Sequence, residues 1–436
     1  MEVDLRQFFR ACNPGKILRV EDSQERKYYI DFASVRGAEV VEELGRTIDL
    51  MHPDPTCQLF SGHIGCGKST ELLRLKADLE GQGFHVVYFE SSQYLDMGDL
   101  DIGDILLAIA HQVSESLEAA DIPLHGSYFA NLLQECADFL QTPIDLEAKA
   151  EVSFGIGKLT AKTKESPKLR SQIRQYLEPQ TEGLLRAINN QLLLPAAQEL
   201  QKRGKQGVVV IIDNLDRVDN RQMPSGQSLA EYLFVARGEQ LGQLKCHVVY
   251  TLPLVLIFSN ELQALTNRLG NGNDPIVLPM VPVRRRDGSE HEEGMQLLRQ
   301  MVLARAFPDG SPEERLAAID KVFDSAETLD RLCRMSGGHV RNLLGLLFKC
   351  LKRAKTLPLT RENLEVAIRE NCDLLTFAIT NDEWELLRQV RESKKVTGEA
   401  QYQTLLRSLF VFEYRDRIDG CWFDLNPMLA EAQELQ

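Results

Sequence analysis

The most constraining feature of this chain is the stretch SGHIGCGKST at residues 61–70. It fits the phosphate-binding pattern G-x-x-x-x-G-K-[ST]. Small residues let successive backbone N–H groups turn toward an anion, and a helix that begins behind the loop adds its positive end. The positions predicted to contact a nucleotide are Gly62, His63, Ile64, Gly65, Cys66, Gly67, Lys68, Ser69 and Thr70.

The residues around the loop supply the strand and the helix that the pattern requires. CQLF (57–60) is a short apolar run, and TELLRLKADLEGQG (70–83) has leucines near helical spacing. FHVVYF (84–89) then predicts the next buried strand. In this context Lys68 is placed to reach the β- and γ-phosphates and the Ser69 hydroxyl to ligate Mg²⁺, so we expect ATP or ADP with Mg²⁺.

A second buried strand is predicted at residues 208–212, within the segment GVVVIIDNLD. Asp213 emerges at its carboxyl end, where open α/β sheets bind ligands. We expect Asp213 to hold Mg²⁺ through water. Asp216, three residues further on, has two interpretations: it polarises the attacking water, or it caps a helix.

These segments resemble the AAA+ and STAND branch of P-loop ATPases. The resemblance rests on SGHIGCGKST, VVVIIDNLD, VVYT (248–251) and SGGHVRN (336–342), and it covers residues 28–373 by order of elements. It implies an α/β fold with a three-layer αβα core around a parallel sheet, followed by an α-helical lid.

The same resemblance implies roles for four further residues. Thr251 occupies the position of a γ-phosphate sensor, and Arg341 that of a second sensor in the lid. Arg268 resembles an arginine finger that completes a neighbour's site, and Arg36 would lie near the purine. Each has a structural alternative: Thr251 as a turn residue, Arg341 as a solvated residue of a helix entry, Arg268 as a cation favoured by the helix dipole, and Arg36 as part of a segment explained by its core valines.

Four regions are expected along the chain. They are an N-terminal segment with the adenine-proximal helix (1–50), the ATPase core (51–283), the helical lid (284–373) and a winged-helix domain (374–436). The last region reads as helix, helix, strand, turn and strand. It carries seven Lys and Arg against eleven Asp and Glu, which is unusual for a reader of duplex DNA. By the resemblance it would instead pack on the nucleotide site as a latch.

An insertion at about 147–175 is predicted to form a β-hairpin, because apolar residues alternate around Gly155 and Gly157. A basic stretch, 158–174, continues from it. Its charged residues are Lys158, Lys162, Lys164, Lys168, Arg170 and Arg174, against Glu165. Such a stretch could contact nucleic-acid phosphates, although a solvated face or an acidic protein partner is the favoured interpretation.

Composition narrows the class of protein. The net charge of −14 over 436 residues argues against a general nucleic-acid binder. The nine cysteines are scattered singly, no apolar run approaches the ~20 residues of a membrane span, and no secretory signal is visible. We therefore expect a cytoplasmic protein that does not enter membranes.

The sequence thus predicts a slow ATPase that acts as a regulatory switch, with a protein partner or further copies of itself. One alternative is a DNA-associated AAA+ ATPase of the initiator or transposition-regulator kind. Another is a scaffold that holds nucleotide without hydrolysis. A small-molecule kinase shares the phosphate loop but leaves the lid, the winged helix and Arg268 without a purpose.

Overall fold

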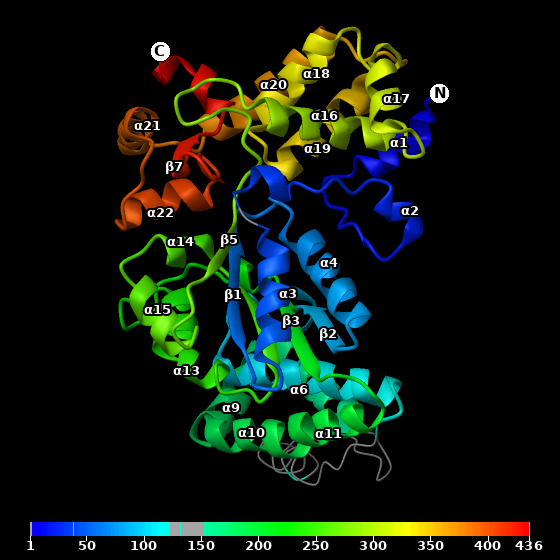
Figure 1. The fold of residues 1–436 in the computed structure, drawn as a ribbon. Helices are drawn as coiled ribbons and strands as arrows, with labels where there is room; N and C mark the ends of the chain where they lie inside the picture. Colours follow the sequence, from blue (N-terminus) through cyan, green and yellow to red (C-terminus); the bar gives the residue numbers. More distant parts are fainter. Residues whose placement is uncertain (1, 38, 123–130, 132–151, 436) are drawn as a thin grey trace. The chain divides into compact units, whose positions relative to one another are not determined.

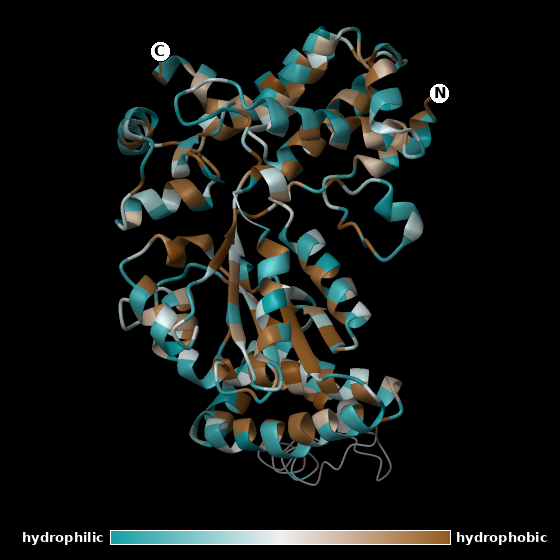
Figure 2. Cartoon of the chain, in the orientation of Figure 1, coloured by the Kyte–Doolittle hydropathy of each residue, from teal (hydrophilic) through white to brown (hydrophobic). Residues whose placement is uncertain are grey.

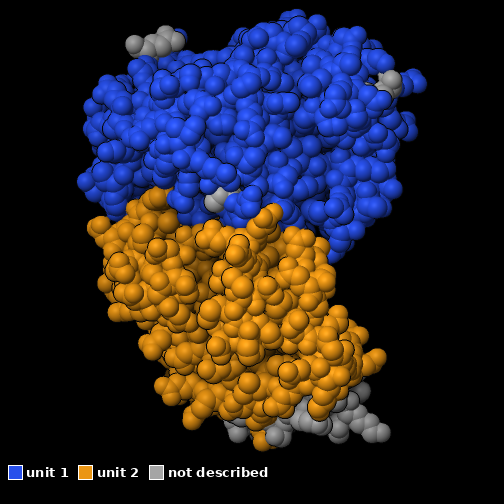
Figure 3. Space-filling model, in the orientation of Figure 1, with its two compact units in different colours: residues 1–40, 62–74, 277–436 blue, residues 41–61, 75–276 orange. Residues whose placement is uncertain are grey.

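The computed structural model describes residues 2–37, 39–122, 131 and 152–435 (Figure 1). The chain divides into two compact units, coloured separately in Figure 3. Unit 1 comprises residues 1–40, 62–74 and 277–436, and unit 2 comprises residues 41–61 and 75–276. The phosphate loop therefore groups with the lid and the C-terminal region, whereas the strand that carries Asp213 belongs to unit 2. The four predicted regions remain a proposal beside this division.

The central sheet has five strands in the order β2-β3-β4-β1-β5. Parallel pairing joins β1 to β4, β2 to β3 and β3 to β4. Every residue of β1, β3 and β4 is buried, so both faces of these strands are covered. The fold is therefore α/β with a parallel sheet, as predicted. The strands are β1 (Cys57–Gly62), β2 (His85–Glu90), β3 (Val208–Asp213), β4 (His247–Leu252) and β5 (Ile276–Leu278).

Helices precede and follow these strands, and Figure 2 shows the apolar strands as brown among them. Around the first two strands lie α3 (Val40–Met51), α4 (Lys68–Gly81), α5 (Ser91–Tyr94) and α6 (Ile102–Ala119). Beyond β3 lie η4 (Leu215–Arg217), α12 (Leu229–Glu231), η5 (Tyr232–Ala236), α13 (Gly238–Leu241), α14 (Leu254–Ile257) and α15 (Leu262–Arg268).

The predicted β-hairpin of the insertion is wrong, because residues 152–165 form a helix. This helix, α8, packs against α6, and a Cβ at Gly157 would lie 2.5 Å from His111 Nε2. Gly157 thus permits close helix packing where the sequence suggested a turn. The insertion contains α8 (Val152–Glu165), α9 (Pro167–Leu177), η2 (Glu178–Gln180), α10 (Thr181–Ala187), η3 (Ile188–Leu193) and α11 (Leu194–Lys202). Residues 147–151 of the predicted insertion lie outside the described residues.

Unit 1 contains the predicted helical region, and its buried core joins N-terminal residues such as Phe8 and Phe32 to the lid. The N-terminal elements are α1 (Leu5–Ala11), α2 (Ser23–Arg26) and η1 (Ala33–Val35). The lid elements are α16 (Glu292–Ala306), α17 (Pro312–Ala317), η6 (Ile319–Lys321), α18 (Ala326–Ser336), α19 (Val340–Arg353) and α20 (Arg361–Thr376).

The C-terminal region has the predicted order of helix, helix, strand, turn and strand. It contains α21 (Asn381–Ser393), α22 (Ala400–Arg407), β6 (Val411–Asp416), β7 (Gly420–Leu425), η7 (Leu429–Glu431) and η8 (Gln433–Leu435). β6 and β7 form an antiparallel hairpin. The assignment of this region to the winged-helix class stays a prediction. Among the described residues, no helix has both the length and the apolar character to cross a bilayer.

Candidate functional site: a phosphate loop and a strand edge

The predicted loop connects β1 to α4, as the phosphate-binding pattern requires. Gly65 has φ +92°, a conformation that L side chains rarely adopt. A Cβ there would also lie 2.8 Å from His339 Nε2 and 2.9 Å from Arg341 Cβ. Gly65 is therefore required both by the backbone and by the close approach of the lid. Ser69 and Thr70 lie in the first turn of α4, partly exposed.

The Lys68 side chain folds back over the loop. Its Nζ donates hydrogen bonds to Gly62 O at 2.7 Å and to His63 O at 3.0 Å, and the residue is only 6% exposed. An anionic phosphate is a stronger partner for an ammonium group than a neutral carbonyl oxygen is. A bound phosphate can therefore draw Lys68 away from these two carbonyls.

Residues of the lid and the N-terminal segment contact three other carbonyls of the loop. His339 Nε2 donates to Ile64 O at 2.8 Å, and the backbone N–H of Arg341 donates to Gly65 O at 3.1 Å. Arg36 Nη2 donates to Cys66 O at 2.8 Å. Two of the arginines predicted to lie at the site, Arg341 and Arg36, thus contact the loop.

His63 joins the loop to the C-terminal hairpin, a contact that the sequence analysis missed. Its Nε2 accepts a hydrogen bond from the backbone N–H of Glu413 in β6 at 2.9 Å. The Phe412 ring lies edge-on to His63, 5.8 Å between centroids, and is stacked on His339 at 5.6 Å. No local pattern could signal this contact, because His63 and Glu413 are 350 positions apart.

These contacts require both histidines to be neutral. His63 accepts at Nε2, and His339 accepts from Asn342 N at Nδ1 while donating from Nε2. Burial, with the charges of His339 and Lys68, lowers the pKa of His63 to about 3. Burial lowers the pKa of His339 to about 4. Both rings therefore stay uncharged at neutral pH. Protonation of His63 would break the bond from Glu413 N, and protonation of His339 would break the bond from Asn342 N.

A cavity of about 60 Å³ lies beside the loop within unit 1. Arg36, 2% exposed, lies over the Phe32 ring at 5.3 Å and 4.0 Å from the Glu71 carboxylate. Tyr29 donates to the same carboxylate at 3.1 Å, and burial raises the pKa of Glu71. Ligand pockets usually measure about 300 Å³ or more, so the purine ring of a nucleotide would have to displace side chains to enter this cavity. The other lining residues include Tyr28, Ile30, Thr70, Met301, Arg305, Val340 and Leu344.

In unit 2, polar side chains follow the carboxyl ends of adjacent strands. Asp213, fully buried, accepts from the Tyr88 hydroxyl at 2.9 Å and from Asn214 N at 2.7 Å, one bond to each oxygen. Burial, with the neighbouring Asp213 carboxylate, raises the pKa of Tyr88. A carboxylate at the end of a buried strand is the kind of oxygen ligand that suits a role in holding Mg²⁺-bound water.

The remaining predicted residues of unit 2 lie as follows. The side chain of Thr251 contacts the end of β3 and the residues just after it. Its Oγ1 donates to Ile212 O at 3.1 Å and accepts from Leu215 N at 3.0 Å. Asp216 lies in the short helix η4 and is 8% exposed. Arg268 is the last residue of α15, and its Nη1 donates to Val235 O at 3.2 Å.

Several side chains of the basic stretch are bound within unit 2. Arg170, 3% exposed, pairs with Asp96 at 2.7 Å and with Asp99 at 2.9 Å. Arg174 pairs with Asp99 at 2.7 Å and with Asp104 at 2.6 Å. Because both guanidinium groups are paired with carboxylates of the protein, fewer cations of the basic stretch are available to bind a nucleic acid.

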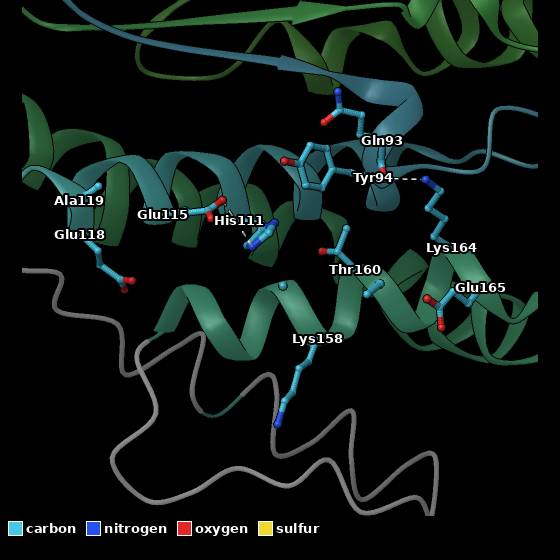
Figure 4. Close-up of a pocket in the computed structure, with 12 residues that line it drawn as sticks. Gln93, Tyr94, His111, Glu115, Glu118, Ala119, Lys158, Thr160, Lys164 and Glu165 are labelled. Carbon is cyan, nitrogen blue, oxygen red and sulfur yellow. Dashed lines mark hydrogen bonds and ion pairs between the residues drawn. The ribbon is translucent and has the colours of Figure 1, made fainter.

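A cavity of about 890 Å³ lies between α5, α6 and α8 (Figure 4). The Tyr94 and His111 rings line it in a T-shaped arrangement, 5.8 Å between centroids. At one end Lys164 Nζ donates to Ser92 O at 3.0 Å and to Gln93 O at 2.6 Å. These hydrogen bonds connect α8 to the short helix α5, which directly follows β2.

The strand, the glycine loop and the helix behind it, set in a parallel sheet, define an α/β protein of the P-loop kind. No protein-family profile matches the chain, and no curated protein matches it in sequence. Among solved structures, it is similar to the Walker-type ATPase PABY2304 of Pyrococcus abyssi, at 12% identity and a TM-score of 0.44, over 96% of this chain and 98% of that one. It is also similar to Cdc6p from Pyrobaculum aerophilum, at 11% identity and a TM-score of 0.37, over 93% and 94%.

Proposed function

We propose that the chain is an ATP-binding and ATP-hydrolysing regulatory switch of the AAA+/STAND type. The observation that carries this proposal is the set of bonds between the phosphate loop and two distant parts of the chain. His63 is bonded to Glu413 of the C-terminal hairpin, and Ile64 is bonded to His339 of the lid. A change in the conformation of the loop would therefore alter a hydrogen bond to each of these two regions.

The path from a phosphate to the hairpin passes through one residue. The Lys68 ammonium donates a hydrogen bond to the carbonyl of His63, and the ring of His63 accepts one from the backbone of β6. When the Lys68 ammonium turns toward phosphate, the peptide of His63 loses a charge-assisted partner and can reorient. Such a movement would strain or release the bond from Glu413 N to the imidazole.

Mg²⁺ bound with ATP would supply charge neutralisation at the phosphates. The Ser69 hydroxyl and Asp213 would hold that ion, and the loop N–H groups with Lys68 would bind the phosphate oxygens. Asp216 would polarise the attacking water. Thr251 and Arg341 remain proposed sensors of the γ-phosphate.

The switch requires that ATP and ADP favour different arrangements. A ligand shifts an equilibrium only by its differential affinity for the two states, so the γ-phosphate must contribute binding energy in one arrangement and not in the other. Arg341 is the proposed source of that difference. Arg268 would act in trans on a second copy of the chain, which makes a homo-oligomer one form of partner.

The DNA-associated alternative finds less support. Arg170 and Arg174 are engaged with carboxylates, and the C-terminal region has a net negative charge. Duplex binding depends on neutralising several phosphates with available Lys and Arg.

Tryptophan fluorescence offers a direct test, because both tryptophans of the chain, Trp384 and Trp422, lie in the C-terminal region. We expect ADP and a non-hydrolysable ATP analogue to give different emission and different small-angle scattering profiles. Wild-type protein should release phosphate from ATP slowly, and Lys68→Ala should abolish nucleotide binding and both signals. Identical spectra and profiles with the two nucleotides would refute the switch, and absence of phosphate release would refute hydrolysis.

A further inference from the structure

Glu90 ends β2 as Asp213 ends β3, and the two residues are paired in the parallel register of the sheet. Paired residues of neighbouring strands project from the same face, with the strands about 4.8 Å apart. Tyr88, two residues before Glu90 and on that same face, donates to Asp213. The Glu90 side chain therefore begins beside the carboxylate that is proposed to hold Mg²⁺.

Asn214 fixes the orientation of this second carboxylate. Its Nδ2 donates to Glu90 Oε2 at 3.0 Å, and the residue is 2% exposed. Asn214 adopts a left-handed conformation, φ 64°, which Asn tolerates better than most residues. The strand end, the amide and the carboxylate thus form one connected group. The turn after Glu90 is held in addition by the bonds from Lys164 to Ser92 and Gln93.

We infer that Glu90 is the general base of ATP hydrolysis and that Asn214 is its positioning residue; this inference rests on the proposed function. Water attacks the γ-phosphorus, a new P–O bond forms, and the bond to the β,γ-bridging oxygen breaks with its electron pair going to ADP. The proton of the water passes to Glu90 and then to the phosphate product.

Glu90 would replace Asp216, the first acidic residue after the β3 strand, in the water-polarising role proposed above. Asp213 already accepts a hydrogen bond at each oxygen and is proposed to hold Mg²⁺-bound water, so a second carboxylate is needed to take the proton. Glu90 lies 124 positions from Asn214, so only the register of β2 and β3 reveals it.

The test compares Glu90→Gln, Glu90→Asp and Asp216→Asn in single-turnover hydrolysis of ATP, together with titrations of a fluorescent ATP analogue. Gln retains an oxygen that can accept from Asn214, so the structural contact survives while the base is lost. We expect Glu90→Gln to slow the chemical step by about 100-fold or more, the usual range for a general base, with nucleotide affinity changed less than about threefold. Glu90→Asp, which keeps a carboxylate, should retain more activity.

A purely structural role for Glu90 predicts a different pattern. Glu90→Gln would then hydrolyse ATP within about threefold of wild type, and this result would overturn the inference. Should Glu90→Gln fail to fold, Glu90→Ala assayed with added formate replaces it: formate should restore hydrolysis in that variant and leave wild type unchanged, and no restoration in a folded, ATP-binding variant would equally overturn the assignment. If wild type shows no hydrolysis above Lys68→Ala, the proposed function fails and the Glu90 assignment falls with it.

Discussion

Glu413 gives the most specific prediction about the contact between loop and hairpin. Its side chain is fully buried in β6, and the Arg415 guanidinium lies 3.5 Å from its carboxylate. Burial raises the pKa of Glu413 from 4.5 to about 7, although Arg415 opposes the shift. The native protein therefore binds a proton at Glu413 in a pH range where the unfolded chain does not.

The sign follows from proton linkage. Between pH 4.5 and 7 the native state holds more protons than the unfolded state, so the contribution of Glu413 is fully present below pH 4.5 and is lost as pH rises through 7. From about pH 5 to about pH 8 the loss amounts to about 2.5 kcal/mol. Glu413→Gln is neutral throughout, so it should have near wild-type stability at pH 5 and exceed it by about 2.5 kcal/mol at pH 8.

His63 and His339 act in the opposite direction. Their native pKa values are depressed, so the unfolded state binds more protons below about pH 6.5 and stability falls as the pH drops. In wild type, Glu413 partly compensates this fall. The Gln variant lacks the compensation and should lose stability more steeply on acidification.

Urea unfolding at pH 5, 6.5 and 8, followed by tryptophan emission, measures these differences. Trp422 is a suitable reporter because it stacks on Tyr414 at 5.5 Å, next to Glu413. Glu399→Gln, at an exposed glutamate of the same region, is the matched control and should show no pH-dependent difference. An equal effect of Glu413→Gln at pH 5 and pH 8, or a less stable variant at pH 8, would show that the buried carboxyl does not titrate as reasoned.

Two other predictions concern the loop and the insertion. Gly65→Ala and Gly67→Ala both place a side chain at positive φ, but only the first adds a Cβ 2.8 Å from His339 Nε2; Gly65→Ala should therefore unfold with about 1–2 kcal/mol less stability than Gly67→Ala in nucleotide-free protein, and equal midpoints in urea would contradict the clash. Arg170→Met removes a buried guanidinium that pairs with Asp96 and Asp99 and donates to Thr163 O, and it should cost about 1–3 kcal/mol in thermal or urea unfolding. Lys168→Met, at an exposed position of the same helix, should cost less than about 0.5 kcal/mol, and similar losses for both would refute the structural role of Arg170.

Local patterns were sufficient for the elements that frame the candidate site. The loop at 61–70, the strand ending at Asp213 and the strand Ile276–Leu278 all depend on short runs of residues whose conformations are preferred locally. The prediction of a β-hairpin in the insertion was wrong because it also relied on local preference alone. Glycines at 155 and 157 suggested a turn, but the packing of α8 on α6 requires a small residue at Gly157. Local preference there yielded to tertiary packing.

The sequence by itself determined that a phosphate loop stands between a strand and a helix, and that an acidic residue ends a buried strand, because both are encoded within a few consecutive residues. Only the tertiary structure decided which distant side chains meet them: Glu413 at His63, and Glu90 at Asn214. Such pairs depend on how strands and helices far apart in the chain are packed. No periodicity or spacing within one segment carries that information.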